Sequence, residues 1–424
     1  MHDLRALREQ AGDLRAAMRR RGQDQILAPS IDRAVELDRE RRATIQAVEE
    51  RKAARNALSH EVARRKKAGE SADEAQASSR ALGGEIAKLE GELAASESQL
   101  NSLLLQLPNV VLDDVPNGGE ESNRVVREWG TPRGIDGIVP HWEIGEKLGL
   151  FDLPRGAKIA GSGFIVYRGE GARLVRSLLN LMLDLHTQEH GYEETWVPVL
   201  ANRAAMTGTS QLPKFEDDMY ALSADDLFLI PTAEVPLTNL YREEILVESD
   251  IPKSFAAYSP CFRREAGSHG KDTRGLLRVH EFDKVELVRY ALPERSAEDL
   301  ELLTGHAERV LQLLELPYRV VLLAAGDTGF ASAKTYDLEV FAPGVGKWLE
   351  VSSCSNFTDF QARRADIRYR PSDGGKPRFV HTLNGSGLAL PRIIAALLEH
   401  GQQPDGSVLL PEALRSYTRT DRLT

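Results

Sequence analysis

The chain has 424 residues, with 54 lysines and arginines against 64 aspartates and glutamates, which gives a formal net charge of -10. A hydrophobic fraction of 42% with 28% charged residues excludes global disorder. No stretch approaches the roughly 20 apolar residues that span a bilayer. Only Cys261 and Cys354 are present, which excludes a disulfide framework and a cysteine-rich zinc site and favours a reducing, cytoplasmic location. The charged start MHDLRALREQ has no apolar stretch, so we expect no signal peptide.

The first part of the chain predicts helices. Residues 1–27 have the pattern of a small helical cap. From Leu82 to Leu107, apolar residues recur at alternating steps of four and three, with Ser96 as the one polar member. This is a heptad seam, and proline at position 108 should end it.

A second helical run, over about 32–67, lies upstream with a poorer seam in which three positions are arginines, namely Arg41, Arg51 and Arg55. The segment 68–74 separates the two runs, with Gly69 as the expected end of the first helix and Ser71 or Asp73 as the cap of the second. A short turn makes the helices antiparallel neighbours. We therefore predict a two-helix coiled-coil arm over about 31–107, roughly 55 Å long at 1.5 Å per residue.

The end of the arm is basic. Residues 51–67 contain seven cations against Glu61 alone, namely Arg51, Lys52, Arg55, Arg64, Arg65, Lys66 and Lys67. Such a surplus on a projecting arm suits a phosphate backbone. A dimerisation coiled coil and a solvated charged face are the alternatives.

The rest of the chain predicts an α+β domain. Residues 108–123 are rich in Pro, Gly, Asn and Asp and read as a linker, so we assign 1–107 to an N-terminal domain and 124–424 to a second domain. An amphipathic helix over 171–190 precedes a strand over 195–200 that contains Pro198, which suggests a sheet edge or an interface with a second copy. Strand patterns follow at 226–232, 258–264, 277–290, 334–342, 347–356 and 377–385. Because short loops join many of these strands, we expect an antiparallel sheet flanked by helices.

Two glycine-rich segments fail as nucleotide motifs. GSHGKDT (267–273) has Glu265 and Asp272 where a P-loop needs glycine and Ser/Thr. GSGLAL (385–390) lacks the third glycine of a dinucleotide fingerprint and is expected to open a helix. No G-x-S-x-G elbow supports a Ser-His-Asp hydrolase.

A polar constellation remains. Arg263 and Glu265 are expected on one strand, with Arg278 and Phe282 on the returning strand, where an arginine can hold a phosphate and an aromatic ring can stack on a purine. Glu350 and Ser353 together offer oxygen ligands that suit Mg²⁺. Arg392 begins an apolar helix and could hold a second phosphate.

These segments resemble the three signature motifs of class II aminoacyl-tRNA synthetases: the helix and strand of 171–198, FRREAG to RVHEF (262–282), and GSGLALPR (385–392). The whole chain is similar to bacterial seryl-tRNA synthetases in GTSQLPKFEDDMY (208–220), PTAEVPL (231–237), EVSSCSNFTDFQARR (350–364) and HTLNGSGLA (381–389). Ser210 stands where that family usually has glycine.

The resemblance implies the roles of individual residues. The serine-binding residues would be Thr232, Ala233, Glu234, Arg263, Glu286, Asn384 and Ser386. The ATP-binding residues would be Arg263, Arg264, Glu265, Val279, Phe282, Glu350, Val351, Ser352, Ser353 and Arg392. Arg263, Arg392 and Glu350 would be catalytic, with Mg²⁺ on Glu350 and Ser353. No Cys/His cluster supports the zinc-dependent form of the family.

The resemblance also implies the reaction. The expected activity is serine–tRNA ligation, in which serine reacts with ATP to give seryl-adenylate and is then transferred to the 3′ end of serine tRNA. The helical arm would contact the long variable arm of that tRNA, and the enzyme would be a cytoplasmic homodimer with no membrane association. A paralogue that passes activated serine to a non-tRNA acceptor is the alternative. The resemblance also allows selenocysteine tRNA as a further substrate.

Overall fold

The computed structural model describes residues 1–266 and 274–424. Its chain divides into two compact units, Met1–Pro108 and Asn109–Thr424. The loop GSHGKDT, discounted above as a P-loop, lies outside the described residues. No helix of the described part is long and apolar enough to cross a membrane.

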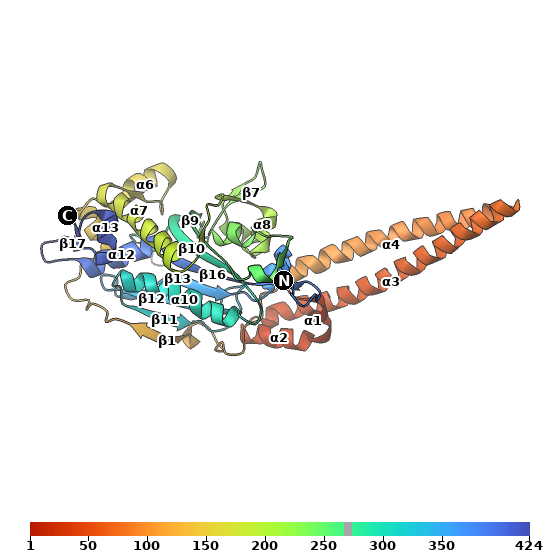
Figure 1. Ribbon diagram of the computed structural model, residues 1–424, viewed down its shortest axis with the longest axis horizontal. Coiled ribbons are helices and arrows are strands. Elements are labelled where there is room, and N and C mark those ends of the chain that lie inside the picture. The colour runs from red at the N-terminus through yellow and green to blue at the C-terminus, as the bar shows by residue number, and fades with distance from the viewer. Residues whose placement is uncertain (267–273) are drawn as a thin grey trace. The chain divides into compact units, whose positions relative to one another are not determined.

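The first unit consists of four helices, α1 (Leu4–Glu9), α2 (Ala11–Arg20), α3 (Asp24–Ala68) and α4 (Asp73–Leu105). Figure 1 shows α3 and α4 running antiparallel along each other, as predicted. Gly69 ends α3 in the left-handed conformation with φ of 72°, as expected. The predicted N-cap of α4 is wrong, because Ala72 occupies that position and makes no side-chain cap.

The helix α3 also starts earlier than the sequence pattern predicts. Its first turns extend back to Asp24 and include Pro29. Ile31, Ala34 and Leu37 of α3 pack with buried side chains of α1 and α2, so tertiary contacts keep this stretch helical.

The arm is joined by its predicted seam and by ion pairs. Every seam position of both helices is buried or half-buried. The seam arginines do not break the pairing, because two of them reach glutamates of the opposite helix: Arg41 Nε lies 2.8 Å from Glu97 and Arg51 Nε lies 2.9 Å from Glu85. The arginines in the poorer upstream seam are therefore paired across the two helices, although exposed ion pairs of this kind add only about 0–1 kcal/mol each.

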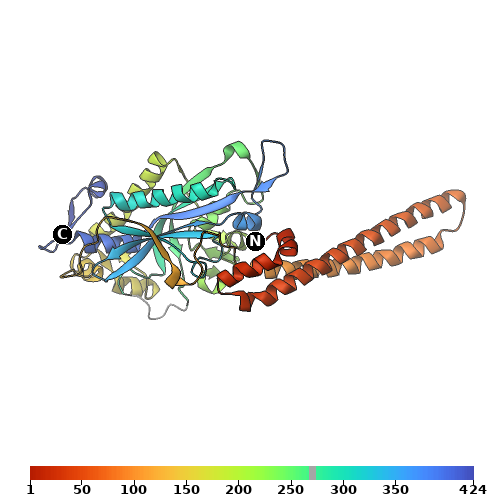
Figure 2. The same ribbon diagram turned by 90° about the horizontal axis from the view of Figure 1, so that it is seen from below.

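The second unit is built on an eight-stranded sheet in the order β1-β11-β12-β13-β16-β10-β9-β4, antiparallel except for the β4–β9 pair. Figure 2 shows its strands twisted across one another. The sheet strands are β1 (Arg124–Trp129), β4 (Glu193–Glu194), β9 (Lys253–Phe262), β10 (Glu281–Ala291), β11 (Tyr318–Leu322), β12 (Lys334–Ala342), β13 (Lys347–Asn356) and β16 (His381–Ala389). The predicted antiparallel sheet is confirmed.

Helices and small sheets surround this sheet. The helices are α5 (His141–Lys147), α6 (Leu153–Ala160), α7 (Gly169–Asp184), α8 (Arg203–Gly208), α9 (Glu234–Thr238), α10 (Ser296–Leu313), α11 (Phe360–Ala365), α12 (Leu390–Gly401) and α13 (Glu412–Thr418), with short turns η1 (Glu120–Ser122), η2 (Leu185–Glu189), η3 (Glu216–Asp218) and η4 (Glu248–Asp250). The outlying strands are β2 (Phe151–Asp152), β3 (Val166–Tyr167), β5 (Leu200–Asn202), β6 (Ala221–Leu222), β7 (Leu227–Leu229), β8 (Ile245–Val247), β14 (Arg368–Arg370), β15 (Arg378–Phe379), β17 (Val408–Leu409) and β18 (Arg422–Leu423).

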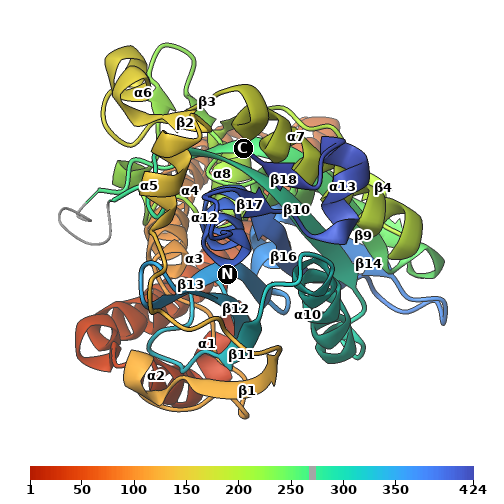
Figure 3. The ribbon, with the colours of Figure 1, turned by 90° about the vertical axis from the view of Figure 1, so that its left-hand side faces the viewer.

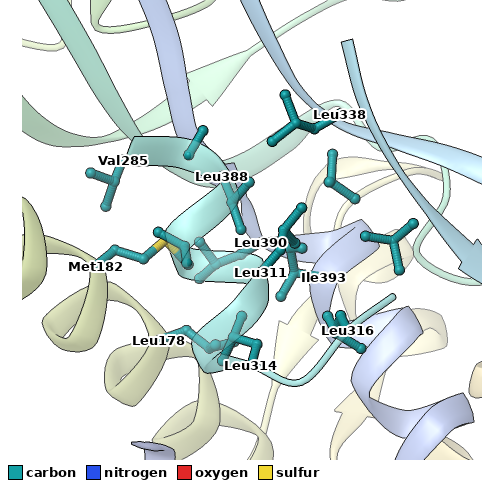
Figure 4. Close-up of a cluster of buried hydrophobic side chains, with 14 of the residues drawn as sticks. Leu178, Met182, Val285, Leu311, Leu314, Leu316, Leu338, Leu388, Leu390 and Ile393 are labelled. Atoms are coloured by element: carbon teal, nitrogen blue, oxygen red, sulfur yellow. The ribbon is translucent and has the colours of Figure 1, made fainter. Parts of the chain in front are cut away.

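The main core lies where α7, α10 and α12 pack on one face of the sheet (Figures 3 and 4). Leu178, Leu311 and Ile393 meet Val285 and Leu338 there. The glycines of GSGLAL serve this packing, because a Cβ at position 385 would collide with a leucine of α10 and one at position 387 would lie 2.8 Å from a histidine of the α7 extension. Close approach of helix and strand therefore explains these glycines.

Three local predictions are corrected by the structure. The segment 195–199 is not a strand, since β4 ends at Glu194 and β5 begins at Leu200. GSGLA belongs to β16, and the helix starts only at Leu390, where a proline suits the first turn. Arg263 and Glu265 follow β9 instead of lying on it, and Glu265 has a left-handed φ of 51°.

Residues 109–123, from the segment 108–123 that was expected as a linker, belong to the second unit and pack within it. The Asn109 side chain donates to the carbonyls of Ala331 (2.9 Å) and Phe357 (2.8 Å). Val111 and Val115 are buried with Ala325.

Both cysteines are buried and unbridged, Cys261 on β9 and Cys354 on β13.

Candidate active site

A cavity of about 660 Å³ opens on the face of the sheet opposite the main core. Alternation along β10 explains this placement, because Val285 and Leu287 point into the core whereas Lys284 and Glu286 point to the other face. Along β16, Asn384 and Ser386 share the cavity face by the same alternation. One face of two central strands, β10 and β16, thus supplies polar groups to a single cavity.

At one end of the cavity an amide joins two buried carboxylates, Glu234 in the cavity wall and Glu286 beneath it. Asn384 Nδ2 donates to Glu234 and to Glu286, at 2.9 Å each. Gln361 Nε2 donates to the other oxygen of Glu234 at 2.7 Å. Burial, and then the negative charge of Glu286, raises the pKa of Glu234 to about 7. This arrangement suits a small cation with hydrogen-bonding groups.

Lys284 belongs to the same cluster, although the sequence analysis did not select it. Its ammonium contacts the Glu286 carboxylate and donates to Thr232 Oγ1 at 2.8 Å. The signal that could have found it is the alternation of the charged residues Lys284 and Glu286 with the apolar residues Val285 and Leu287 on β10.

The other end of the cavity carries the aromatic ring and arginines expected for a nucleotide. The guanidinium carbon of Arg263 lies 5.2 Å from the centre of the Phe282 ring. Glu265 pairs with Arg278 at 2.6 Å. A planar base can lie against such a ring, and the cations can face phosphates.

A group of oxygen donors lies at the edge of this end. Arg392 donates to the Glu350 carbonyl at 2.6 Å and lies 3.6 Å from its carboxylate. Ser353 lines the cavity on β13, directly opposite Asp337 of β12. Burial, and then the Glu350 charge, raises the pKa of Asp337 well above its usual range. Asp337 Oδ1 is buried and has no hydrogen-bond partner among the described residues. These are hard oxygen ligands of the kind that Mg²⁺ prefers.

Most of the predicted site residues meet at this cavity. Its lining includes Thr232, Glu234, Arg263, Glu265, Val279, Phe282, Glu350, Val351, Ser353, Asn384, Ser386 and Arg392. Four predicted residues do not line it, namely Ala233, Arg264, Glu286 and Ser352. Ala233 and Ser352 are buried beneath it, and Ser352 donates to the Ser386 carbonyl at 2.8 Å. Arg264 is exposed.

The basic residues of the arm divide into two groups. Arg51 and Lys52 pair with Glu85 and Glu90 of α4, while Arg64 and Arg65 pair with Glu61. Within the described part of the chain no ion pair is found for Arg55, Lys66 and Lys67. Lys66 and Lys67 are exposed at the end of α3, so the surplus charge there is smaller than the count along one helix suggests.

Comparisons with known proteins agree with this architecture. Residues 1–111 match the family model of the seryl-tRNA synthetase N-terminal domain, and residues 214–401 match that of the tRNA synthetase class II core domain (G, H, P, S and T). The chain is 66% identical to a serine–tRNA ligase of Gemmatimonas aurantiaca over 418 residues, covering 98% of each chain. It is 52% identical to the serine–tRNA ligase of Geobacillus kaustophilus over 419 residues, again covering 98% of each.

Solved structures show the same likeness. A seryl-tRNA synthetase from Pyrococcus horikoshii, complexed with ATP, superimposes with a TM-score of 0.94 at 37% identity and covers 100% of this chain and 99% of its own. The cytoplasmic serine–tRNA ligase of Naegleria fowleri, complexed with AMP, gives a TM-score of 0.88 at 30% identity over 100% and 99% of the two chains. The chain therefore belongs to the seryl-tRNA synthetases, ATP-dependent ligases of the class II aminoacyl-tRNA synthetase family.

Proposed function

We propose that this chain activates serine with ATP and transfers it to serine tRNA. The observation that carries the proposal is one cavity with two unlike ends. The Glu234–Asn384–Glu286 cluster suits an amino acid, and the Arg263–Phe282 pair suits a nucleotide.

The first reaction is an in-line displacement. A serine carboxylate oxygen attacks the α-phosphorus of ATP, the bond to the bridging oxygen breaks, and pyrophosphate leaves with the electron pair. Arg263 faces the α-phosphate and the serine carboxylate, and Arg392 faces the γ-phosphate. Positioning and charge neutralisation account for such a step without a general base.

Serine is selected by hydrogen bonding at the carboxylate end. Glu234 takes the α-ammonium, and Glu286 with Ser386 takes the side-chain hydroxyl. Alanine would leave buried polar groups unpaired, which can discriminate by about 10⁴ or more.

The oxygen donors at the nucleotide end fit Mg²⁺. Glu350 and Ser353 would hold it, and Asp337, with a buried oxygen lacking a partner among the described residues, adds negative charge beside them. When bound, the ion would neutralise charge on the phosphates of ATP.

The second reaction delivers serine to tRNA. The terminal ribose hydroxyl attacks the carbonyl carbon of seryl-adenylate, an ester bond forms, the hydroxyl proton is released, and AMP leaves with the electrons of the broken anhydride bond. The arm binds the long variable arm of the tRNA through backbone contacts. Lys66 and Lys67 are the cations that we expect to contribute most to tRNA binding. Smaller contributions are expected from Arg51, Lys52, Arg55, Arg64 and Arg65.

The active form is a cytoplasmic homodimer in this proposal. The Trp196 side chain, between β4 and β5, is 82% exposed, and its ring lies 6.0 Å from that of Tyr258. A large exposed aromatic beside Pro198 suits an interface with a second copy. The helix α7 adds little to this argument, because Leu174, Leu178 and its other apolar residues are buried in the core of the same unit.

A serine-dependent ATP–pyrophosphate exchange assay, followed by charging of serine tRNA, tests the proposal. The wild-type chain should catalyse both reactions. A variant in which residues 49–88 are replaced by a short glycine linker should keep exchange and lose charging, since the cut leaves the α1–α2 packing of the arm base intact. Exchange without charging in the wild type would instead favour the paralogue that uses a non-tRNA acceptor.

A further inference from the structure

The imidazole of His141, the first residue of α5, is fully buried between two segments that are far from it in the sequence. Its Nδ1 lies 2.8 Å from Glu399 Oε1 on α12, and the backbone N–H of Leu276 donates to its Nε2 at 3.1 Å. Because Nε2 accepts a hydrogen bond, the ring proton is on Nδ1 and is donated to Glu399. These two contacts fix both the tautomer and the orientation of the ring.

Glu399 holds the ring because its own carboxylate is held. The side chain is fully buried, and it also accepts from the backbone N–H groups of His141 at 3.1 Å and of Gly344 at 2.8 Å. A Cβ at position 344 would lie 2.8 Å from the Cα of Pro140 and 2.9 Å from Glu399 Cδ, so glycine is needed for this close approach. A carboxylate with three N–H donors is a rigid support for the imidazole.

The other partner of the ring belongs to residues 275–279, which we call the wall segment. Gly275 has a φ of 67°, and a Cβ there would collide with the His141 ring, so the backbone passes directly against the imidazole. The N–H of Leu276 is buried, and a buried N–H without an acceptor is costly. His141 therefore supplies an acceptor that this backbone position requires.

One face of α12 holds the wall segment at two points. Arg392 and Glu399 are seven residues apart, which places them about two turns apart on the same face of the helix. Arg392 Nε donates to the Leu277 carbonyl at 3.2 Å, while Glu399 acts through His141 on the N–H of Leu276. The helix thus fixes an N–H and a carbonyl of two successive residues.

The wall segment forms part of the nucleotide end of the active-site cavity. Leu276, Leu277, Arg278 and Val279 line the cavity, and Arg278 pairs there with Glu265 at 2.6 Å. Neither His141 nor Glu399 is among the described residues that line it. These two side chains can therefore act on a nucleotide only through the backbone that they hold.

We propose that His141, oriented by Glu399, is a positioning residue for ATP. It accepts the Leu276 N–H and so sets the place of Arg278 and Val279 at the nucleotide end. This inference rests on the proposed function. Loss of the acceptor leaves a buried N–H unpaired and releases the wall segment, which weakens ATP binding and leaves the serine end, at Glu234 and Asn384, unchanged.

Two amide substitutions separate the two ring nitrogens. The Asn amide nitrogen reaches the place of Nδ1, so His141→Asn keeps a donor to Glu399 and lacks the acceptor for Leu276. In ATP–pyrophosphate exchange its KM for ATP should rise by about two- to tenfold, the effect of one lost hydrogen bond, with KM for serine unchanged. Isothermal titration with ATP alone should show the same loss of affinity.

The Gln amide oxygen reaches the place of Nε2, so His141→Gln keeps an acceptor for Leu276 and lacks the donor to Glu399. This variant should recover most of the affinity for ATP, although it should melt at a lower temperature than the wild type because a buried carboxylate has lost a partner. A role of His141 in stability alone would not separate the two variants in this way.

A control and a second variant complete the experiment. His400→Asn makes the same substitution on α12, where the ring Nε2 lies 2.8 Å from the Phe341 carbonyl, and should leave both KM values unchanged. Gly275→Ala places a methyl group against the His141 ring without changing the buried pair, and should raise KM for ATP as His141→Asn does. It keeps the proposal testable if His141→Asn does not fold.

The possible results are distinct. An unchanged KM for ATP in folded His141→Asn or in Gly275→Ala, or an equal rise of both KM values, would overturn the positioning role. Equal losses of ATP affinity in His141→Asn and His141→Gln would also overturn it, since the shape of the ring and not its acceptor would then matter. A wild type without exchange activity would instead remove the proposed function on which this inference rests.

Discussion

The ionisation of Glu234 should set the pH dependence of serine activation. The pKa of this carboxyl is raised to about 7, first by burial and then by the charge of Glu286, with Lys284 and Arg263 acting in the opposite direction. Only the ionised carboxylate can pair with the α-ammonium group of serine. Protonation as the pH falls through 7 therefore removes the binding-competent form of the free enzyme.

The size of the effect follows from that pKa. About ten-elevenths of Glu234 is ionised at pH 8 and about one-eleventh at pH 6, so kcat/KM for serine in the exchange reaction should fall about tenfold between these values. Glu234→Gln should lower kcat/KM at pH 8 by roughly 10- to 150-fold, which is the loss of one charge-assisted hydrogen bond of about 1.5–3 kcal/mol. The variant should also lose the slope between pH 6 and 8. A wild-type profile that is flat over this range, or a variant that keeps the slope, would refute the role given to Glu234.

Three further predictions concern the nucleotide, the tRNA and the second copy. Arg263→Ala should lower the exchange rate by about 10²-fold or more, because it removes the cation beside Phe282 that we propose to face the α-phosphate; retained exchange would remove that role. The double variant Lys66→Ala, Lys67→Ala should weaken tRNA binding and reduce its salt dependence by about one unit of slope per lysine, while Lys88→Ala, an exposed lysine 3.9 Å from a glutamate, should change little; equal effects would argue against the end of α3 as the contact. Trp196→Asp should convert a dimer to a monomer in sedimentation at micromolar protein, and a wild type that is already monomeric would contradict the interface.

The arm could be predicted from the sequence because the heptad periodicity of its apolar residues is a local property of each helix. The heptad seam and Gly69 predict two antiparallel helices, and both features are found. The start of α3 could not be predicted from the sequence, because packing against α1 and α2 keeps the chain helical where the heptad pattern is absent. The basic surplus was overestimated for a related reason: a count along one helix does not include Glu85 and Glu90, which pair with it from the opposite helix.

The site was predictable as a set of residue types and less so as a geometry. The resemblance supplied the residues, and the structure brings most of them to one cavity. Lys284 and Asp337 were missed, because charged residues are common on both of their strands and only the folded structure brings Lys284 to Thr232 and Asp337 to Ser353. Glu265 was placed on a strand, although its left-handed backbone lies beyond the end of the ladder.

The two buried thiols can be used as chemical probes of the opening of the central sheet. Cys261 and Cys354 are fully covered in strands that flank the active-site residues, and burial raises the pKa of Cys354 to about 12. A thiol-specific reagent should therefore modify them only when the central sheet separates. The rate of modification, measured with and without serine or ATP, would give the free energy that each ligand adds to the closed sheet, without any engineered label.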